Sequence, residues 1–126
     1  MLKKLTTFED LLVWQKAHEL VLNTYTFSKR FPVEETNGLT QQLRKSITTV
    51  ASHIAEGYKS PNPGRRMQYL SQAQDLLNRY RYFLILSEDL SYGKSELLYT
   101  QTQEVDALLK DYIDTTRNSL SFDFAS

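Results

Sequence analysis

The sequence contains no cysteine, which excludes disulfides and thiolate metal sites. A reducing compartment is therefore the expected environment. No apolar stretch approaches the ~18 residues of a membrane span, and the first seven residues lack the uninterrupted apolar region of a signal peptide. We therefore predict a cytoplasmic protein without a membrane-spanning segment.

Glycine and proline are also scarce, with four and three among 126 residues. Because both residue types weaken helix interiors, this scarcity, together with 40% hydrophobic residues, is typical of a helical globular domain. A chain of this length can bury enough surface to fold as one domain without disulfides or metals. Neither internal repeats nor low-complexity segments are visible in it.

The groupings of side chains that catalysis requires are missing as well. There is no glycine-rich phosphate loop, and no serine or threonine has a recognisable base and orienting group. His53 and Glu56 are three residues apart, but the Glu-x-x-His order of dimetal bundles is reversed and has no second copy. The other histidine, His18, belongs to a different predicted helix. We predict no catalytic residues, no metal site and no cofactor, and interpret His53 and Glu56 as polar helix-packing residues.

Residues 38–59 form the central element of the predicted fold. At 3.6 residues per turn, apolar side chains fall on one stripe of this segment, and polar, mostly cationic side chains fall on the other side. The apolar stripe consists of Leu39, Leu43, Ile47, Val50, Ile54 and Tyr58. We predict a helix whose apolar stripe faces the core.

Three further helices are predicted from their capping signals. Thr6 and Thr7 stand at capping-box spacing before Glu9 and Asp10, so the first helix should run from about residue 8 to 30 and end before Pro32. On this helix we place Leu11, Trp14, Ala17, Val21, Tyr25 and Ser28 on the core stripe, beside Val13, Leu20, Phe27 and Phe31. Asn62 followed by Pro63 starts a third helix that ends near residue 90. Ser95 can cap a fourth helix, which should end near residue 118.

Because the four predicted helices are joined by short loops, we predict an all-α fold, an antiparallel up-down-up-down four-helix bundle. We assign residues 1–118 to this single domain and residues 119–126 to a tail that is ordered only if Phe122 and Phe124 dock. Residues 80–86 are apolar almost all round, which a surface helix of a monomer does not need. We therefore predict a subunit interface at this segment and an obligate oligomer.

The charges are balanced overall but are unevenly distributed along the chain. Residues 41–82 contain seven basic and two acidic residues, a balance of +5, whereas residues 83–126 contain three basic and eight acidic residues, a balance of −5. From the positive balance of residues 41–82 we therefore predict a basic surface that contacts phosphates. Its basic residues are Arg44, Lys45, Lys59, Arg65, Arg66, Arg79 and Arg81. The alternative is that these charges pair within or between subunits.

The aromatic residues include eight tyrosines, six phenylalanines and one tryptophan, and such rings can stack on nucleic-acid bases. Most of them fall on the predicted core stripes. We assign Trp14, Tyr69, Tyr80 and Phe83 to packing and keep only Tyr58 and Tyr82 as surface contacts.

Several short motifs of the first half resemble a known family. They are Phe8-x-x-Leu11-x-Val13-Trp14-Gln15-Lys16-Ala17, Phe31-Pro32-x-Glu34, Gly38-Leu39-x-x-Gln42-x-Arg44 and Ile54-Ala55-Glu56-Gly57. This pattern is similar to the four-helix-bundle proteins encoded in intervening sequences of bacterial 23S ribosomal RNA genes. The resemblance implies an antiparallel bundle assembled into a ring-like homopentamer, for which nucleic-acid binding has been proposed. A related branch is the accessory protein of diversity-generating retroelements, which binds a reverse transcriptase and its RNA.

The third helix departs from the family pattern. It carries Asp75-Leu76 and Arg79 where Gly-Ser and a glutamate are usual, and His53 replaces an asparagine before the Ile-Ala-Glu-Gly motif. Loss of an acid and gain of Arg79 and Arg81 favour an anion-binding surface. We predict a non-enzymatic oligomer that binds structured RNA or duplex DNA with little sequence preference. The alternatives are a retroelement accessory protein that binds a reverse transcriptase, and a structural scaffold without a nucleic-acid partner.

Overall fold

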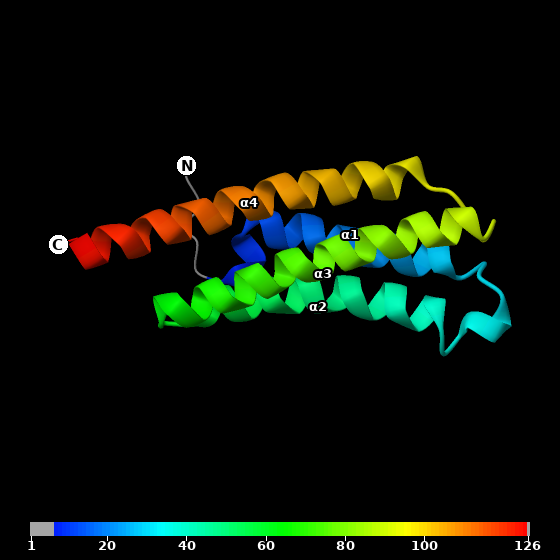
Figure 1. The fold of residues 1–126 in the computed structure, drawn as a ribbon, viewed down its shortest axis with the longest axis horizontal. Coiled ribbons are helices and arrows are strands. Elements are labelled where there is room, and N and C mark those ends of the chain that lie inside the picture. Colours follow the sequence, from blue (N-terminus) through cyan, green and yellow to red (C-terminus); the bar gives the residue numbers. More distant parts are fainter. Residues whose placement is uncertain (1–6, 126) are drawn as a thin grey trace.

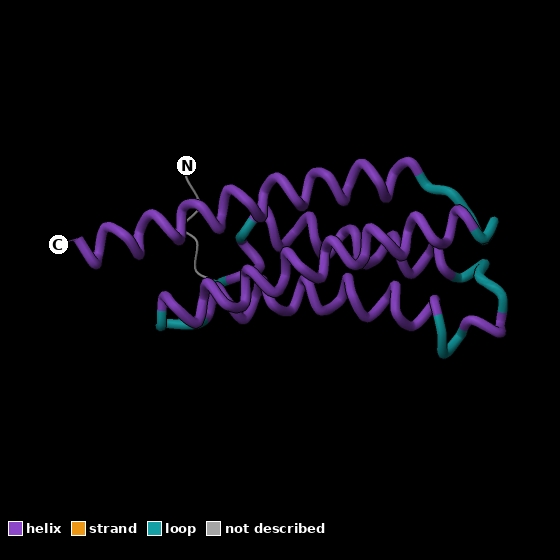
Figure 2. The backbone as a smooth tube through the Cα atoms, in the orientation of Figure 1, coloured by secondary structure: helices purple, strands orange, loops and turns teal. Residues whose placement is uncertain are grey.

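The computed structural model describes residues 7–125, with side chains described through residue 118. Four helices account for most of this part: α1 (Leu12–Ser28), α2 (Leu39–Lys59), α3 (Pro63–Asp89) and α4 (Glu96–Ala125). Two short 3-10 helices, Phe8–Asp10 and Val33–Glu35, precede α1 and α2. Figure 2 shows that the described chain is helical apart from short connections. The predicted all-α fold class is confirmed.

The four helices form an up-down bundle. Each helix packs against the next in the chain, and α1 also packs against α4, which closes the bundle. In Figure 1 the α1–α2 and α3–α4 connections lie at one end and the α2–α3 connection lies at the other. The predicted antiparallel topology is therefore confirmed.

The core is formed by the apolar stripes of the four helices. In α2, Leu43, Ile47, Val50 and Ile54 are fully buried, as the spacing predicts, whereas Tyr58 at the end of the stripe is only partly buried. In α3 the stripe includes Leu70, Leu77 and Tyr80, which are almost completely buried. The helical period therefore identifies the buried face of both helices.

The first helix differs from the prediction in its start and in its face. The Thr7 N–H donates to Asp10 Oδ2 over 3.3 Å, but this contact closes a 3-10 turn instead of starting the α-helix. Leu11 is extended, with a ψ of 126°, so α1 begins at Leu12. Tyr25, predicted on the core stripe, is 41% exposed, because Leu20 and Thr24 occupy the core instead.

The caps of the later helices are confirmed. Asn62 Oδ1 accepts the Arg65 N–H at 3.0 Å, and Ser95 Oγ accepts the Leu98 N–H at 3.2 Å. These contacts satisfy backbone donors that the first turn of a helix leaves unpaired. α4 continues past the predicted end at Asn118 as far as Ala125. The predicted docking of Phe122 and Phe124 lies outside the described side chains.

The outer face of α3 carries exposed apolar side chains. Tyr82 is 56% exposed and Ile85 is 42% exposed, as their positions opposite the core stripe predict, whereas Leu86 is partly buried. No helix in the described part of the chain is long and apolar enough to cross a membrane.

Candidate nucleic-acid interface

The seven cations predicted to contact phosphates occupy different environments in the bundle. Two are held by hydrogen bonds within the chain, four lie on the outer face where α2 meets α3, and one lies between α3 and α4. The structure therefore divides the predicted surface into three parts.

Arg44 is bound to the first helix. Its Nε donates to Ser28 Oγ at 2.8 Å, its Nη2 lies 3.4 Å from the Tyr25 carbonyl oxygen, and its guanidinium lies 4.6 Å from the centre of the Tyr25 ring. A guanidinium over an aromatic face is stabilised by the charge distribution of the ring. Arg44 therefore joins α1 to α2, and its guanidinium is held against the Tyr25 ring.

Arg66 fixes the connection between α2 and α3. Its Nε donates to the Gly57 carbonyl at 3.0 Å, and its Nη2 donates to the carbonyls of Tyr58 and Ser60 at 3.1 and 3.0 Å. The last carbonyls of a helix have no partner within the helix, so these bonds cap α2. Arg66 was predicted to contact phosphates, but it is partly buried and holds the end of α2 in place.

Lys45, Lys59, Arg65 and Arg79 form what we call the cationic groove, which follows the outer boundary between α2 and α3. Lys45 and Arg79 line one hollow of about 160 Å³, and Lys59 and Arg65 line another of about 340 Å³. Lys45 and Lys59 are 14 residues apart on α2, and so are Arg65 and Arg79 on α3. At ~1.5 Å per residue, the two cation pairs are therefore about 21 Å apart along the antiparallel helices.

The four cations of the cationic groove are exposed and make no ion pair within the described residues. Asp75, one turn before Arg79, makes none either. Glu104 of α4 pairs with Lys16 of α1 at 3.4 Å. Within the described residues the four cations are therefore not ion-paired, although Glu56 lines the same hollow as Lys59 and Arg65.

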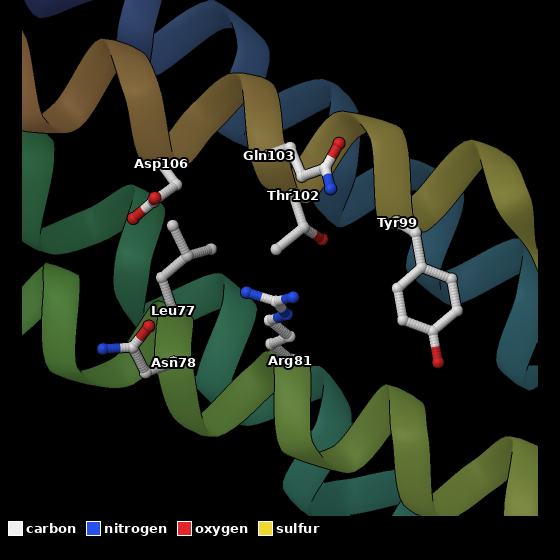
Figure 3. A pocket seen from close by; sticks show the side chains of 7 residues that line it. All are labelled: Leu77, Asn78, Arg81, Tyr99, Thr102, Gln103 and Asp106. Atoms are coloured by element: carbon white, nitrogen blue, oxygen red, sulfur yellow. The ribbon is translucent and has the colours of Figure 1, made fainter.

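Arg81 lies on another side of the bundle. Residues two apart on a helix point about 200° apart, so Arg81 faces away from Arg79. Figure 3 shows its guanidinium pointing from α3 toward α4, where Asp106 and Gln103 line the same small cavity. This cavity of about 40 Å³ has room for a few water molecules but not for a nucleotide.

Tyr69 was predicted to be a packing residue, and it is partly buried against α2. It also lines the same hollow as Lys59 and Arg65, which was not predicted from the sequence. Its ring centre lies 5.6 Å from that of His53. The signal in the sequence was the four-residue spacing from Arg65, which places both side chains on one face of α3.

His53 and Glu56 border the groove on the α2 side. His53 Nδ1 lies 3.3 Å from Glu56 Oε2, although Nδ1 has no hydrogen-bond partner of good geometry. Within the described residues, no three His, Cys, Asp or Glu side chains are grouped as metal ligands would be. The pair is thus a polar contact at the edge of the groove.

The fold and the groove together define the class of protein. It is an antiparallel four-helix bundle with a groove between its second and third helices that is lined by four exposed cations. The model of the 23S rRNA-intervening sequence protein family matches residues 9–111. The chain therefore belongs to this family, and the resemblance seen in its motifs is confirmed. A comparison with curated proteins gave no match. The relation to retroelement accessory proteins stays a hypothesis.

Proposed function

We propose that the chain is a non-enzymatic, oligomeric helical-bundle protein that binds RNA or DNA through the cationic groove. The observation that supports this proposal is the set of four exposed cations that lack acidic partners among the described residues. A protein of zero net charge gains little attraction to nucleic acid from its overall charge. Local concentration of cations on one groove supplies that attraction instead.

Phosphate binding in the groove is favoured by the release of counterions. Each phosphate neutralised by a lysine or arginine releases condensed cations, so affinity falls steeply as salt rises. The two cation pairs can contact phosphates about 21 Å apart on one strand or on two strands. Such contacts fix the position of the nucleic acid without reading its bases.

The proposed contact surface is smaller than the sequence alone predicted. Lys45, Lys59, Arg65 and Arg79 remain in it, whereas Arg44 and Arg66 are occupied by intramolecular hydrogen bonds. Arg81 faces the α3–α4 cavity and contributes to a separate surface. Charge reversal of Arg65 together with Arg66 is therefore a poor test, because loss of Arg66 removes the cap of α2.

Oligomerisation is part of the proposal. The exposed apolar side chains Tyr82 and Ile85 of α3 provide a surface that association would cover. Both project from α3 away from its core stripe. The family resemblance favours a homopentamer, in which the groove would be repeated five times.

The experiment is a gel shift at low salt with structured RNA and duplex DNA. Charge reversal at either end of the groove, Lys45→Glu with Arg79→Glu or Lys59→Glu with Arg65→Glu, should weaken binding at least tenfold. The matched control, Lys29→Glu with Arg30→Glu, makes the same charge change at exposed residues beyond the end of α1 and should bind like wild type. Unchanged helical content and mass would show that the variants fold and assemble.

The two other functions predict different results. A pure scaffold retains neither RNA nor DNA even at low salt. A retroelement accessory protein binds a reverse transcriptase, and a neighbouring gene for that enzyme is the cheapest sign of it. No contact in the described structure favours either function over groove binding.

A further inference from the structure

The hollow at the α2–α3 end of the cationic groove has the composition of a ligand site. Its lining comes from the end of α2, the connecting loop and the first two turns of α3, and consists of Glu56, Lys59, Ser60, Pro61, Arg65 and Tyr69. We call it the loop recess. Its volume of about 340 Å³ lies within the ~300–1,000 Å³ typical of small-ligand sites.

The walls of the loop recess are held in place before any ligand binds. Arg66 ties the carbonyls of Gly57, Tyr58 and Ser60 together, and Asn62 caps α3. A Cβ on Gly57 would lie 3.3 Å from Tyr69 Cβ and 3.2 Å from Leu70 Cδ2, so glycine permits the close approach of α2 and α3. A preorganised site loses less conformational entropy on binding.

The Glu56 carboxylate lies among the cations of the loop recess, so the charges of the recess do not complement a phosphate alone. Glu56 is 46% exposed, and its Oε2 lies 3.3 Å from His53 Nδ1. A phosphate is attracted by Lys59 and Arg65 but repelled by Glu56. A ligand that fits all three side chains carries negative charge at one end and N–H donors at the other.

Tyr69 adds a flat apolar surface to this set. Nucleotides combine a phosphate with a planar base, and aromatic rings in nucleic-acid sites commonly stack on such bases. Among the four RNA bases, only guanine presents two adjacent N–H donors, N1 and N2, on its Watson–Crick edge. A carboxylate with two acceptor oxygens accepts both.

We propose that the loop recess binds an unpaired guanine nucleotide of the nucleic acid held in the cationic groove. The base stacks on Tyr69, Glu56 accepts its N1 and N2 protons, and Lys59 and Arg65 contact the adjoining phosphates. The guanine is unpaired because its Watson–Crick edge and one face have to be free, as in a loop or bulge. This inference rests on the proposed function and adds a base preference to it.

The test uses fluorescence anisotropy with labelled seven-nucleotide RNAs that are uridine except at the centre. The central residue is guanosine, adenosine or inosine, and inosine differs from guanosine only by lacking the N2 amine. Because one hydrogen bond to a charged group is worth about tenfold in affinity, we expect guanosine to bind about tenfold tighter than inosine. Adenosine should bind more weakly still, because its N1 carries no proton. Pairing the guanosine RNA with its complement should abolish this advantage.

Variants assign the preference to the recess. Glu56→Gln should bind the guanosine and inosine RNAs about equally, Tyr69→Leu should weaken binding of all three, and Tyr69→Phe should bind like wild type because the ring remains. Glu34→Gln changes an exposed carboxylate elsewhere and serves as the matched control for Glu56→Gln. If Tyr69→Leu fails to fold, the inosine comparison and Glu56→Gln decide the question.

Two results overturn the inference and leave the proposed function standing. In the first, wild type binds all three RNAs with equal affinity. In the second, folded Glu56→Gln keeps the wild-type preference for guanosine. In both cases the combined Lys59→Glu and Arg65→Glu variant must still lose binding. If wild type retains none of the RNAs at low salt, the inference and the proposed function both fail.

Discussion

Ile54 illustrates how a single α2 side chain stabilises the bundle. It is fully buried in the core, beside the equally buried Val50. We predict that Ile54→Ala lowers the free energy of unfolding by about 2–4 kcal/mol, because it loses buried apolar surface and leaves a cavity. Denaturant unfolding measures this change. An unchanged midpoint would mean that the assigned face of α2 is not the core face.

Tyr80 makes the stability of the bundle sensitive to alkaline pH. The Tyr80 hydroxyl lies 2.5 Å from Thr24 Oγ1, and either hydroxyl can donate in this buried contact. Burial raises the pKa of Tyr80 well above its ordinary value, and the hydrogen bond to Thr24 opposes this only in part. The neutral hydroxyl is therefore favoured in the folded state, and ionisation opposes folding.

The contribution of neutral Tyr80 to stability is fully present below the pKa of tyrosine in the unfolded chain, which is about 10, and is lost as pH rises above that value. We predict that Tyr80→Phe lowers the free energy of unfolding by about 0.5–1.5 kcal/mol at neutral pH. Above pH 10 the free energy of unfolding of this variant should fall less steeply with pH than that of wild type. Stability of the variant should still fall somewhat above pH 10, because burial also raises the pKa of Tyr112. Denaturant unfolding at pH 7 to 11 measures both effects, and parallel curves for the two proteins would contradict the role of Tyr80.

At the scale of the element, Arg66 and Arg65 are adjacent residues of α3 with different roles. Arg66 donates to three carbonyls at the end of α2, whereas the Arg65 side chain is exposed. We predict that Arg66→Gln lowers the free energy of unfolding by about 1–3 kcal/mol, because it leaves partly buried carbonyls without partners. Arg65→Gln is the control and should change it by less than about 0.5 kcal/mol. Equal effects in thermal or denaturant unfolding would remove the assigned role of Arg66.

The four helices and most of their ends could be predicted from the sequence, because caps such as Asn62 and Ser95 and the 3.6-residue period are local signals. The start of α1 could not, since Leu11 leaves the helical conformation despite the capping residues before it. The separation of Arg81 from Arg79 follows from helical geometry and was predictable. The roles of Arg44 and Arg66 depend on which carbonyls the folded chain places nearby, and a helical wheel does not contain that information.

At the scale of the whole molecule, the apolar face of α3 predicts association. We expect multi-angle light scattering at micromolar concentration to give an oligomeric mass, with a pentamer as the expected size. Tyr82→Glu combined with Ile85→Glu should reduce that mass without loss of helix, because both residues are exposed in the single chain. A stable wild-type monomer would contradict the oligomer prediction.

The salt dependence of nucleic-acid binding tests the central claim most directly. If Lys45, Lys59, Arg65 and Arg79 each neutralise one phosphate, a plot of log affinity against log salt should have a slope of about −3. Lys59→Glu with Arg65→Glu should make the slope shallower by about 1 to 2, while the Lys29→Glu and Arg30→Glu control keeps the wild-type slope. Absence of binding at low salt, or the same slope in the groove variant and wild type, would contradict the claim that this groove binds nucleic acid.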